Sequence, residues 1–228
     1  MSLRFDYQPF PDIDKPLREQ LGQYPRVPDI TLDVLRTLAR WLVIGAIRAQ
    51  YRIARSGAIP TGERVALLAN HRSHLDTLAV LAALPERRRR RIAALAARDY
   101  FFERLPRALA ASLFGMAVAF DRTRYTELRR WARLLETQRE GWLLVYPSGS
   151  RKRAEAHDAI LFVLAHSGWT LVPVAIEGSA EAWPVGRKLW RPFRTIEVRF
   201  GEPLPASSTK HLSAELARFW SSGGVADA

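Results

Sequence analysis

Short apolar runs alternate with helical stretches along most of this chain, and this alternation restricts the fold more than any other feature. A continuous apolar run bounded by turn residues is typical of a strand buried on both faces. Such runs occupy residues 64–69, 92–97, 115–120, 142–146 and 171–176, and residues 195–200 (TIEVRF) are also expected to form a strand. Helical periodicity is found over 73–84, 102–115, 124–139, 156–167 and 210–221. The alternation predicts an α/β fold with a mostly parallel central sheet flanked by helices.

The N-terminal part of the chain follows a different pattern. Residues 1–29 are rich in proline, which predicts an irregular arm. Apolar residues recur at helical spacing over 30–56, with arginines between them, and Gly57 and Pro60 follow. We therefore expect a basic amphipathic helix over 30–56, so that residues 1–56 form an N-terminal helical segment and residues 57–228 the α/β domain. Such a helix either lies in a membrane interface or packs on the core, and its pattern fits both.

The composition indicates an anionic partner and excludes cysteine chemistry. Lys and Arg total 35 against 23 Asp and Glu, a formal net charge of +12, which favours nucleic acid, anionic lipid or an acidic carrier. The chain has no cysteine, so disulfides, thiolate metal sites and cysteine nucleophiles are excluded. We see no signal-peptide pattern and no apolar stretch near the roughly 20 residues that span a bilayer. We expect any membrane contact to be at the surface.

The segment with the clearest chemical signature is residues 69–76, with the sequence ANHRSHLD, between a predicted strand and a predicted helix. In open α/β sheets, functional sites collect at this kind of position. Asp76 could hold one ring nitrogen of His71 protonated and leave the other free as a general base. Alternatively, Ser73 and Asp76 only cap the helix. A metal site formed by His71, His74 and Asp76 is a further reading, although no other cluster has the spacing to complete it.

Further motifs follow the first in a fixed order, each at the end of a predicted strand or inside one. They are Phe120-Asp121-Arg122, Tyr146-Pro147-Ser148-Gly149-Ser150-Arg151, Val172-Pro173-Val174 and the ending Val198-Arg199-Phe200-Gly201-Glu202-Pro203. In this order they resemble the motifs of the glycerolipid acyltransferases, whose best-known members acylate glycerol-3-phosphate or 1-acylglycerol-3-phosphate. The resemblance runs from about residue 60 to Pro203.

The resemblance implies an enzyme that moves a fatty acyl group from acyl-CoA or an acyl carrier protein to a lyso-phospholipid hydroxyl. His71 and Asp76 match the family's catalytic dyad. His71 would deprotonate the acceptor hydroxyl and then protonate the departing thiolate, so no acyl-enzyme and no cofactor would be needed. We expect backbone N–H groups near the helix start to hold the oxyanion.

Other positions are expected to bind substrate. The arginines of the second and third blocks would hold the acceptor's phosphate, since a guanidinium binds phosphate through two parallel hydrogen bonds. Pro173 would shape the acyl or acceptor pocket. The expected substrate-binding residues are Asn70, Ser73, Arg122, Ser148, Gly149, Ser150, Arg151 and Pro173.

The third block departs from the family pattern, which usually reads Phe-Pro-Glu-Gly-Thr-Arg. Ser148 stands where the family has a Glu that is thought to bind or orient the acceptor. The usual Lys-x-Gly after this block is also missing, because the chain reads Glu155-Ala156-His157-Asp158-Ala159. The His71 and Asp76 pair is kept, so the departures concern the acceptor. A catalytically weak relative that binds anionic lipid, or an enzyme for a different lipid acceptor, is the alternative reading.

The remaining expectations concern partners and location. The run Arg87–Arg91 is either a patch for anionic lipid or an acidic carrier, or a solvated helix end. No recognised nucleic-acid motif is present and the aromatic residues do not interleave with basic ones, so we expect no nucleic-acid partner. Together with the resemblance, this predicts a peripheral protein on the cytoplasmic, inner face of the membrane.

Overall fold

The computed structural model describes residues 16–26, 29–121, 125–148, 158–184, 191–205 and 208–222. These residues form a seven-stranded sheet with the order β1-β7-β6-β2-β5-β3-β4. The strands are β1 (Arg52–Ser56), β2 (Arg64–Ala69), β3 (Ile92–Ala97), β4 (Ala117–Phe120), β5 (Gly141–Val145), β6 (Thr170–Glu177) and β7 (Thr195–Phe200). All neighbouring strands are parallel except β6 and β7, which are antiparallel. The predicted α/β fold with a mostly parallel sheet is confirmed.

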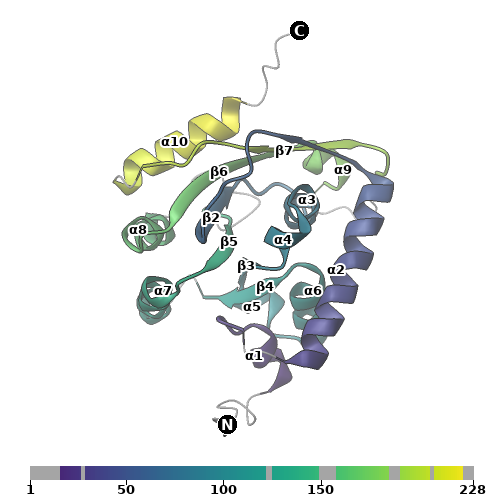
Figure 1. Cartoon of the computed structure of the whole chain (residues 1–228), viewed down its shortest axis with the longest axis horizontal. Helices are drawn as coiled ribbons and strands as arrows, with labels where there is room; N and C mark the ends of the chain where they lie inside the picture. The colour runs from purple at the N-terminus through teal and green to yellow at the C-terminus, as the bar shows by residue number, and fades with distance from the viewer. Residues whose placement is uncertain are drawn as a thin grey trace, which may run out of the picture.

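Helices cover both faces of this sheet (Figure 1). One face packs against α2 (Ile30–Gln50) and α3 (Asp76–Ala83), and the other against α7 (Tyr125–Thr137), α8 (Asp158–His166) and α10 (Thr209–Ser221). Side chains of β2 alternate between these two cores, because successive residues of a strand point to opposite faces. The remaining helices are α1 (Leu17–Leu21), α4 (Glu86–Arg89), α5 (Arg98–Phe101), α6 (Leu105–Phe114) and α9 (Ser179–Ala182).

The strands expected at 64–69, 92–97 and 195–200 match β2, β3 and β7 residue for residue, and the other predicted elements differ by a few residues at their ends. Strands such as β2 are predicted well because both of their faces are buried, whereas in β7 buried apolar residues alternate with more exposed polar ones. In β2, for example, Val65 to Ala69 are all buried. Hydrophobic content alone therefore marks their full length.

The N-terminal predictions need two corrections. The helix expected over 30–56 ends at Gln50, and residues 52–56 form β1, which pairs in parallel with β7 at the edge of the sheet. These five residues thus belong to the sheet and not to the N-terminal helical segment. The irregular arm also contains α1, whose Leu21 is fully buried beside Phe102 and Ala108. No helix among the described residues is long and apolar enough to cross a membrane.

The helix expected over 73–84 begins later than predicted, at Asp76, and ends at Ala83. Ser73 is not its N-cap, because Leu75 occupies that position. The Ser73 hydroxyl instead accepts a hydrogen bond from the Leu75 N–H and donates one to the Trp183 carbonyl. Residues 70–75 therefore form a turn between β2 and α3, and this turn carries the histidine.

Candidate active site

His71 and Asp76 lie together at the carboxyl end of β2, in the middle of the sheet. His71 Nδ1 is 2.8 Å from Asp76 Oδ2. The Asp76 side chain is 1% exposed, whereas that of His71 is 23% exposed. The carboxylate is thus hidden behind the imidazole, and the ring reaches toward solvent. The predicted pair is therefore formed in the structure.

The turn before α3 holds the Asp76 carboxylate from the backbone side. Oδ2 accepts hydrogen bonds from the Arg72 N–H at 2.6 Å and the Ser73 N–H at 2.8 Å, in addition to its contact with His71. These two N–H groups and that of Leu75 are already engaged within the turn. The expectation that backbone N–H groups near the helix start hold an oxyanion is therefore wrong for these three residues, because each N–H already has an acceptor.

Ser179 completes the surroundings of Asp76 and was not predicted from the sequence. Its hydroxyl donates a hydrogen bond of 2.6 Å to Asp76 Oδ1. Ser179 is the first residue of α9, directly after Gly178, which has a φ of 75°. This turn lies so close to β7 that a Cβ on Gly178 would come within 2.3 Å of the Thr195 carbonyl oxygen. A glycine at position 178 therefore allows α9 to place Ser179 against the carboxylate.

Tyr146, at the carboxyl end of the neighbouring strand β5, lies against the imidazole. The rings of His71 and Tyr146 are stacked, with centroids 4.2 Å apart and an interplanar angle of 28°. The Tyr146 hydroxyl is 2.8 Å from Thr77 Oγ1 in α3. Burial, and to a lesser extent the negative charge of Asp76, raises the pKa of Tyr146 well above its ordinary value of 10.0. The phenol is thus neutral, and it restricts the orientation of the His71 ring.

Asn70 and Ser73 have positions that orient the turn. The Asn70 side chain donates to the Ile176 carbonyl at 3.0 Å and accepts from the Ile176 N–H at 2.7 Å. It thereby extends the pairing of β2 with β6 by side-chain hydrogen bonds, and Ser73 ties the turn to Trp183. In the structure both residues support the backbone around His71, a role different from the substrate contacts expected for them.

The other predicted site residues are distributed as follows. Ser148 follows β5 and is 2% exposed. Pro173 is buried inside β6, opposite Leu68, and its carbonyl accepts a hydrogen bond from the Gly201 N–H. Arg122, Gly149, Ser150 and Arg151 lie outside the described residues.

A metal site does not form among the described residues, where no group of three or more His, Cys, Asp or Glu side chains could hold an ion. The ring of His74 lies against Trp183, with centroids 5.3 Å apart. The described arrangement can instead perform acid–base chemistry. With Nδ1 turned to a buried carboxylate, Nε2 of His71 is the ring nitrogen left to accept a proton.

Comparisons with known proteins give a family match and a structural match. A family model described as Acyltransferase matches residues 51–177, which is more than half of the chain and includes His71, Asp76 and Tyr146. A search of curated proteins finds no match. Among solved structures, the chain resembles the 1-acyl-sn-glycerophosphate acyltransferase PlsC from Thermotoga maritima, with a TM-score of 0.63 and 19% sequence identity. The match covers 84% of this chain and 77% of that one, and it shows a shared fold.

Proposed function

Because this chain belongs to the acyltransferase family, we propose that it transfers a fatty acyl group from acyl-CoA or an acyl carrier protein to a lyso-phospholipid hydroxyl at a membrane surface. The family match and the resemblance of the sequence motifs support this reaction. The observation that carries it is the 2.8 Å contact between His71 Nδ1 and the buried Asp76 carboxylate. A histidine held in this way is suited to activate a hydroxyl.

The reaction follows from the orientation of His71. Nε2 takes the proton of the acceptor hydroxyl as its oxygen attacks the thioester carbonyl carbon, and the new C–O bond forms a tetrahedral intermediate. The charge of Asp76 stabilises the imidazolium that results. When the C–S bond breaks, the thiolate takes the proton from His71 Nε2 and leaves as the free thiol. His71 returns to its neutral form with no covalent intermediate on the protein, so the reaction needs no cofactor.

Acceptor recognition is proposed for Arg122 and Arg151, on the evidence of their motifs alone. Replacing Arg151 by Gln should raise the KM for a phosphate-bearing acceptor about tenfold and change kcat less, since a charge-assisted hydrogen bond is lost. The exposed Arg87→Gln is the control for loss of one positive charge. An unchanged KM in Arg151→Gln would remove this residue from the acceptor site.

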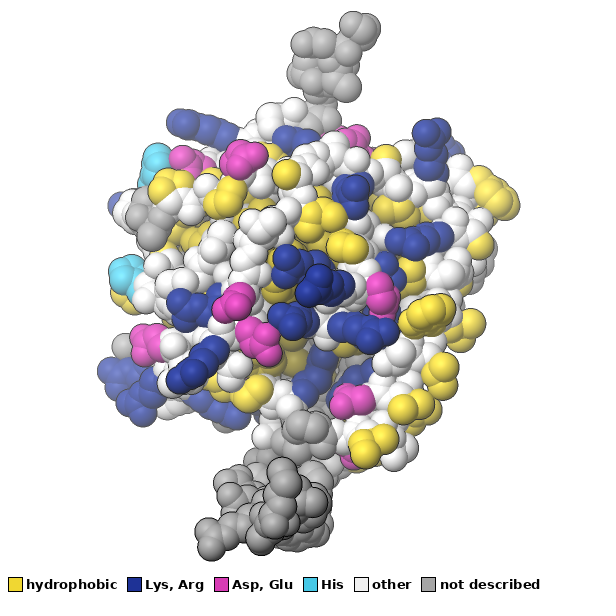
Figure 2. Space-filling view, in the orientation of Figure 1, with side chains coloured by type: hydrophobic (Ala, Val, Ile, Leu, Met, Phe, Trp, Pro, Cys, Tyr) yellow, Lys and Arg dark blue, Asp and Glu magenta, His cyan; other side chains and the backbone are white. Residues whose placement is uncertain are grey.

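Membrane attachment is proposed for the outer side of α2. Its exposed apolar residues follow one stripe at helical spacing: Ile30 (86% exposed), Val34 (53%), Leu35 (46%), Leu38 (63%), Trp41 (64%) and Leu42 (72%). The opposite side of the helix is buried, including Ile44 and Ile47. These apolar side chains form the edge of the molecule where α2 lies (Figure 2). An apolar stripe of this length supports insertion into a lipid interface, and the net charge of +12 supports an anionic one, such as the inner face of a membrane.

Ser148 replaces the Glu that is usual in this family, so the acceptor is to be identified by experiment. Thiol release should be measured with a panel of acyl-CoAs and with lysophosphatidate, glycerol-3-phosphate and other lyso-lipids, comparing the wild-type protein with His71→Ala. Acceptor-dependent release that disappears in the variant supports the enzyme and names its acceptor class. No release with any acceptor, together with binding to anionic liposomes, would favour a lipid-binding relative without turnover.

A further inference from the structure

A cavity of about 410 Å³ lies between α2, the segment Tyr24–Arg26 and the beginnings of β3 and β5. Two of its lining residues mark the beginnings of these strands. Arg91 directly precedes β3, and Gly141 is the first residue of β5. β2, β5 and β3 are parallel neighbours, and His71 follows the carboxyl end of β2. The cavity therefore lies at the amino ends of the parallel strands, whereas the His71–Asp76 pair lies at their carboxyl ends. The proposed acyl transfer does not use it.

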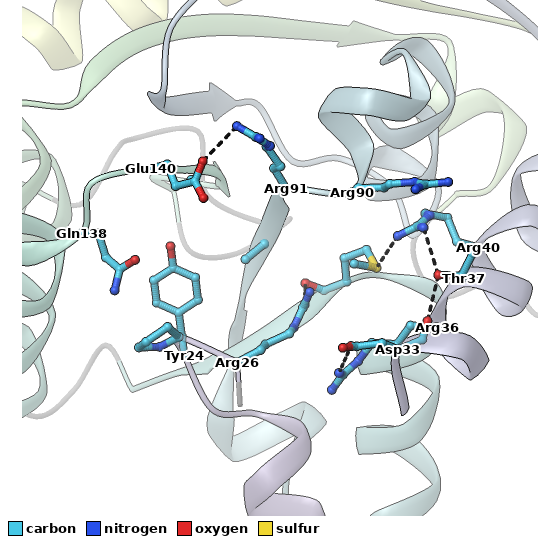
Figure 3. A pocket seen from close by; sticks show the side chains of 14 residues that line it. Tyr24, Arg26, Asp33, Arg36, Thr37, Arg40, Arg90, Arg91, Gln138 and Glu140 are labelled. Carbon is cyan, nitrogen blue, oxygen red and sulfur yellow. Dashed lines mark hydrogen bonds and ion pairs between the residues drawn. The ribbon is translucent and has the colours of Figure 1, made fainter. Parts of the chain in front are cut away.

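Arginine side chains dominate the lining of this cavity (Figure 3). They come from three parts of the chain and are Arg26, Arg36, Arg40, Arg90 and Arg91. The carboxylates that line the same cavity are Asp33 and Glu140. Positive charge from separate segments thus converges on one partly open cavity.

The available carboxylates do not neutralise these arginines. Arg36 pairs with Asp33 at 3.1 Å, and Arg91 with Glu140 at 3.0 Å. Arg40 and Arg90 both form ion pairs with Glu86, at 3.4 and 3.2 Å, and Glu86 also pairs with Arg89. Even when Glu86 is counted, the arginines at the cavity outnumber the acids among the residues that the structure describes.

Burial makes this excess costly. Arg36 and Arg40 are 4% and 3% exposed. The Nε atoms of Arg26 and Arg40 are buried and have no hydrogen-bond partner in the part of the chain that the structure describes. One Nη atom of Arg26 donates to the Met116 carbonyl, while burial and then the nearby Arg36 lower the pKa of Arg26 to about 10. Buried cationic donors without acceptors are destabilising until an anion supplies the acceptors.

We propose that this cavity is a binding site for a phosphate monoester, separate from the catalytic residues. A phosphate dianion matches the excess of arginine, and its oxygens match the planar forks of guanidinium groups. The cavity volume is within the range of small-molecule sites, roughly 300–1,000 Å³, so it has room for an organic group as well. Tyr24, Ala93 and Met116 provide the apolar surface for that group.

The site would link three parts of the molecule. Its arginines belong to the segment before α2, to the inner side of α2, and to the connection between α4 and β3. A bound phosphate would connect the inner side of α2 to the amino end of β3. The outer side of the same helix carries the exposed apolar stripe. Two sources have the required chemistry, a soluble phosphorylated metabolite and the headgroup of a lipid such as phosphatidic acid.

The test is calorimetric titration of the whole chain with inorganic phosphate and with glycerol 2-phosphate. Arg122→Gln/Arg151→Gln serves as the background, so that the proposed acceptor site cannot account for the signal. In this background, Arg90→Gln/Arg91→Gln removes two cavity arginines that are 61% and 49% exposed. The matched control is Arg87→Gln/Arg133→Gln, which removes two exposed arginines outside the cavity lining.

We expect binding of one phosphate probe per chain, weakened about tenfold or more by Arg90→Gln/Arg91→Gln and less than about twofold by the control variant. No binding of either probe to the background protein, or equal weakening by both double variants, would overturn the proposal. Vesicles of phosphatidylcholine with phosphatidic acid or with phosphatidylglycerol distinguish the sources. A preference for phosphatidic acid that is lost in Arg90→Gln/Arg91→Gln indicates a lipid headgroup, and binding of glycerol 2-phosphate without that preference indicates a soluble ligand.

Discussion

The hydroxyl of Ser179 donates a 2.6 Å hydrogen bond to Asp76 Oδ1, although the two residues are 103 positions apart in the chain. The other oxygen, Asp76 Oδ2, contacts His71 and accepts hydrogen bonds from two backbone N–H groups. Both oxygens of the buried carboxylate are therefore hydrogen-bonded. The orientation of His71, the proposed general base, therefore depends on α9 as well as on its own turn.

Replacing Ser179 by Ala should lower kcat about tenfold with little change in the acceptor KM, because Asp76 can rotate away from His71. The lost donor should also reduce the free energy of unfolding by about 1–3 kcal/mol. Ser167→Ala is the matched control, since Ser167 is also buried but its hydroxyl donates to the Val163 and Leu164 carbonyls of the preceding helix α8. If both variants lose activity equally, Ser179 has no special role in positioning Asp76.

His71→Ala and Asp76→Ala should both abolish most turnover, by about 10²–10⁴-fold, since each removes the general base or its orienting group. Their stabilities should differ. His71 is partly exposed and Asp76 keeps three other donors without it, so His71→Ala should reduce the unfolding free energy less than Asp76→Ala, which leaves buried donors unpaired at a cost of about 1–3 kcal/mol each. Urea unfolding of the two variants checks this difference, and equal stabilities would contradict the hydrogen-bond network around Asp76.

Tyr146 should act through its ring and not through its hydroxyl. Tyr146→Phe keeps the stacking on His71 and should retain most activity, whereas Tyr146→Ala should lower kcat about tenfold. Steady-state kinetics of both variants separates the two roles. A larger loss in Tyr146→Phe than in Tyr146→Ala would mean that the hydroxyl takes part in the reaction.

The raised pKa of Tyr146 also predicts a pH dependence of stability. Below about pH 10 the phenol is neutral in the folded and the unfolded chain, so it adds no pH dependence there. Above pH 10 the unfolded chain loses this proton more readily than the folded one, and the wild-type protein becomes less stable. Tyr146→Phe should show a smaller decrease in unfolding free energy above pH 10, measured by urea unfolding across this range. Parallel curves would contradict the raised pKa.

Membrane binding should be sensitive to the outer side of α2. Leu38→Glu places a charge in the exposed stripe and should weaken co-sedimentation with anionic vesicles about tenfold or more, from the lost burial of one apolar side chain. Phe162→Glu is the control, because Phe162 on α8 is similarly exposed, at 55% against 63% for Leu38. Both variants should keep their melting temperatures. Equal loss of vesicle binding would mean that charge alone, and not the α2 stripe, governs attachment.

Some features of this protein were determined by local sequence. The central strands could be predicted because they are buried on both faces, and the segment 69–76 identified His71 and Asp76 through short-range spacing. The family resemblance, confirmed by the match over residues 51–177, rests on motifs of the same local kind. Each of these properties is determined by a few neighbouring residues.

Other features were decided only by the tertiary structure. β1 was predicted as helix because an edge strand with exposed side chains owes its conformation to backbone hydrogen bonds with a distant partner, here β7. Ser179, the stacking of Tyr146 on His71 and the arginine-lined cavity each join residues far apart in the chain. Their chemistry arises from distances in space, which follow from the packing of the sheet and its helices and have no signal in the local sequence.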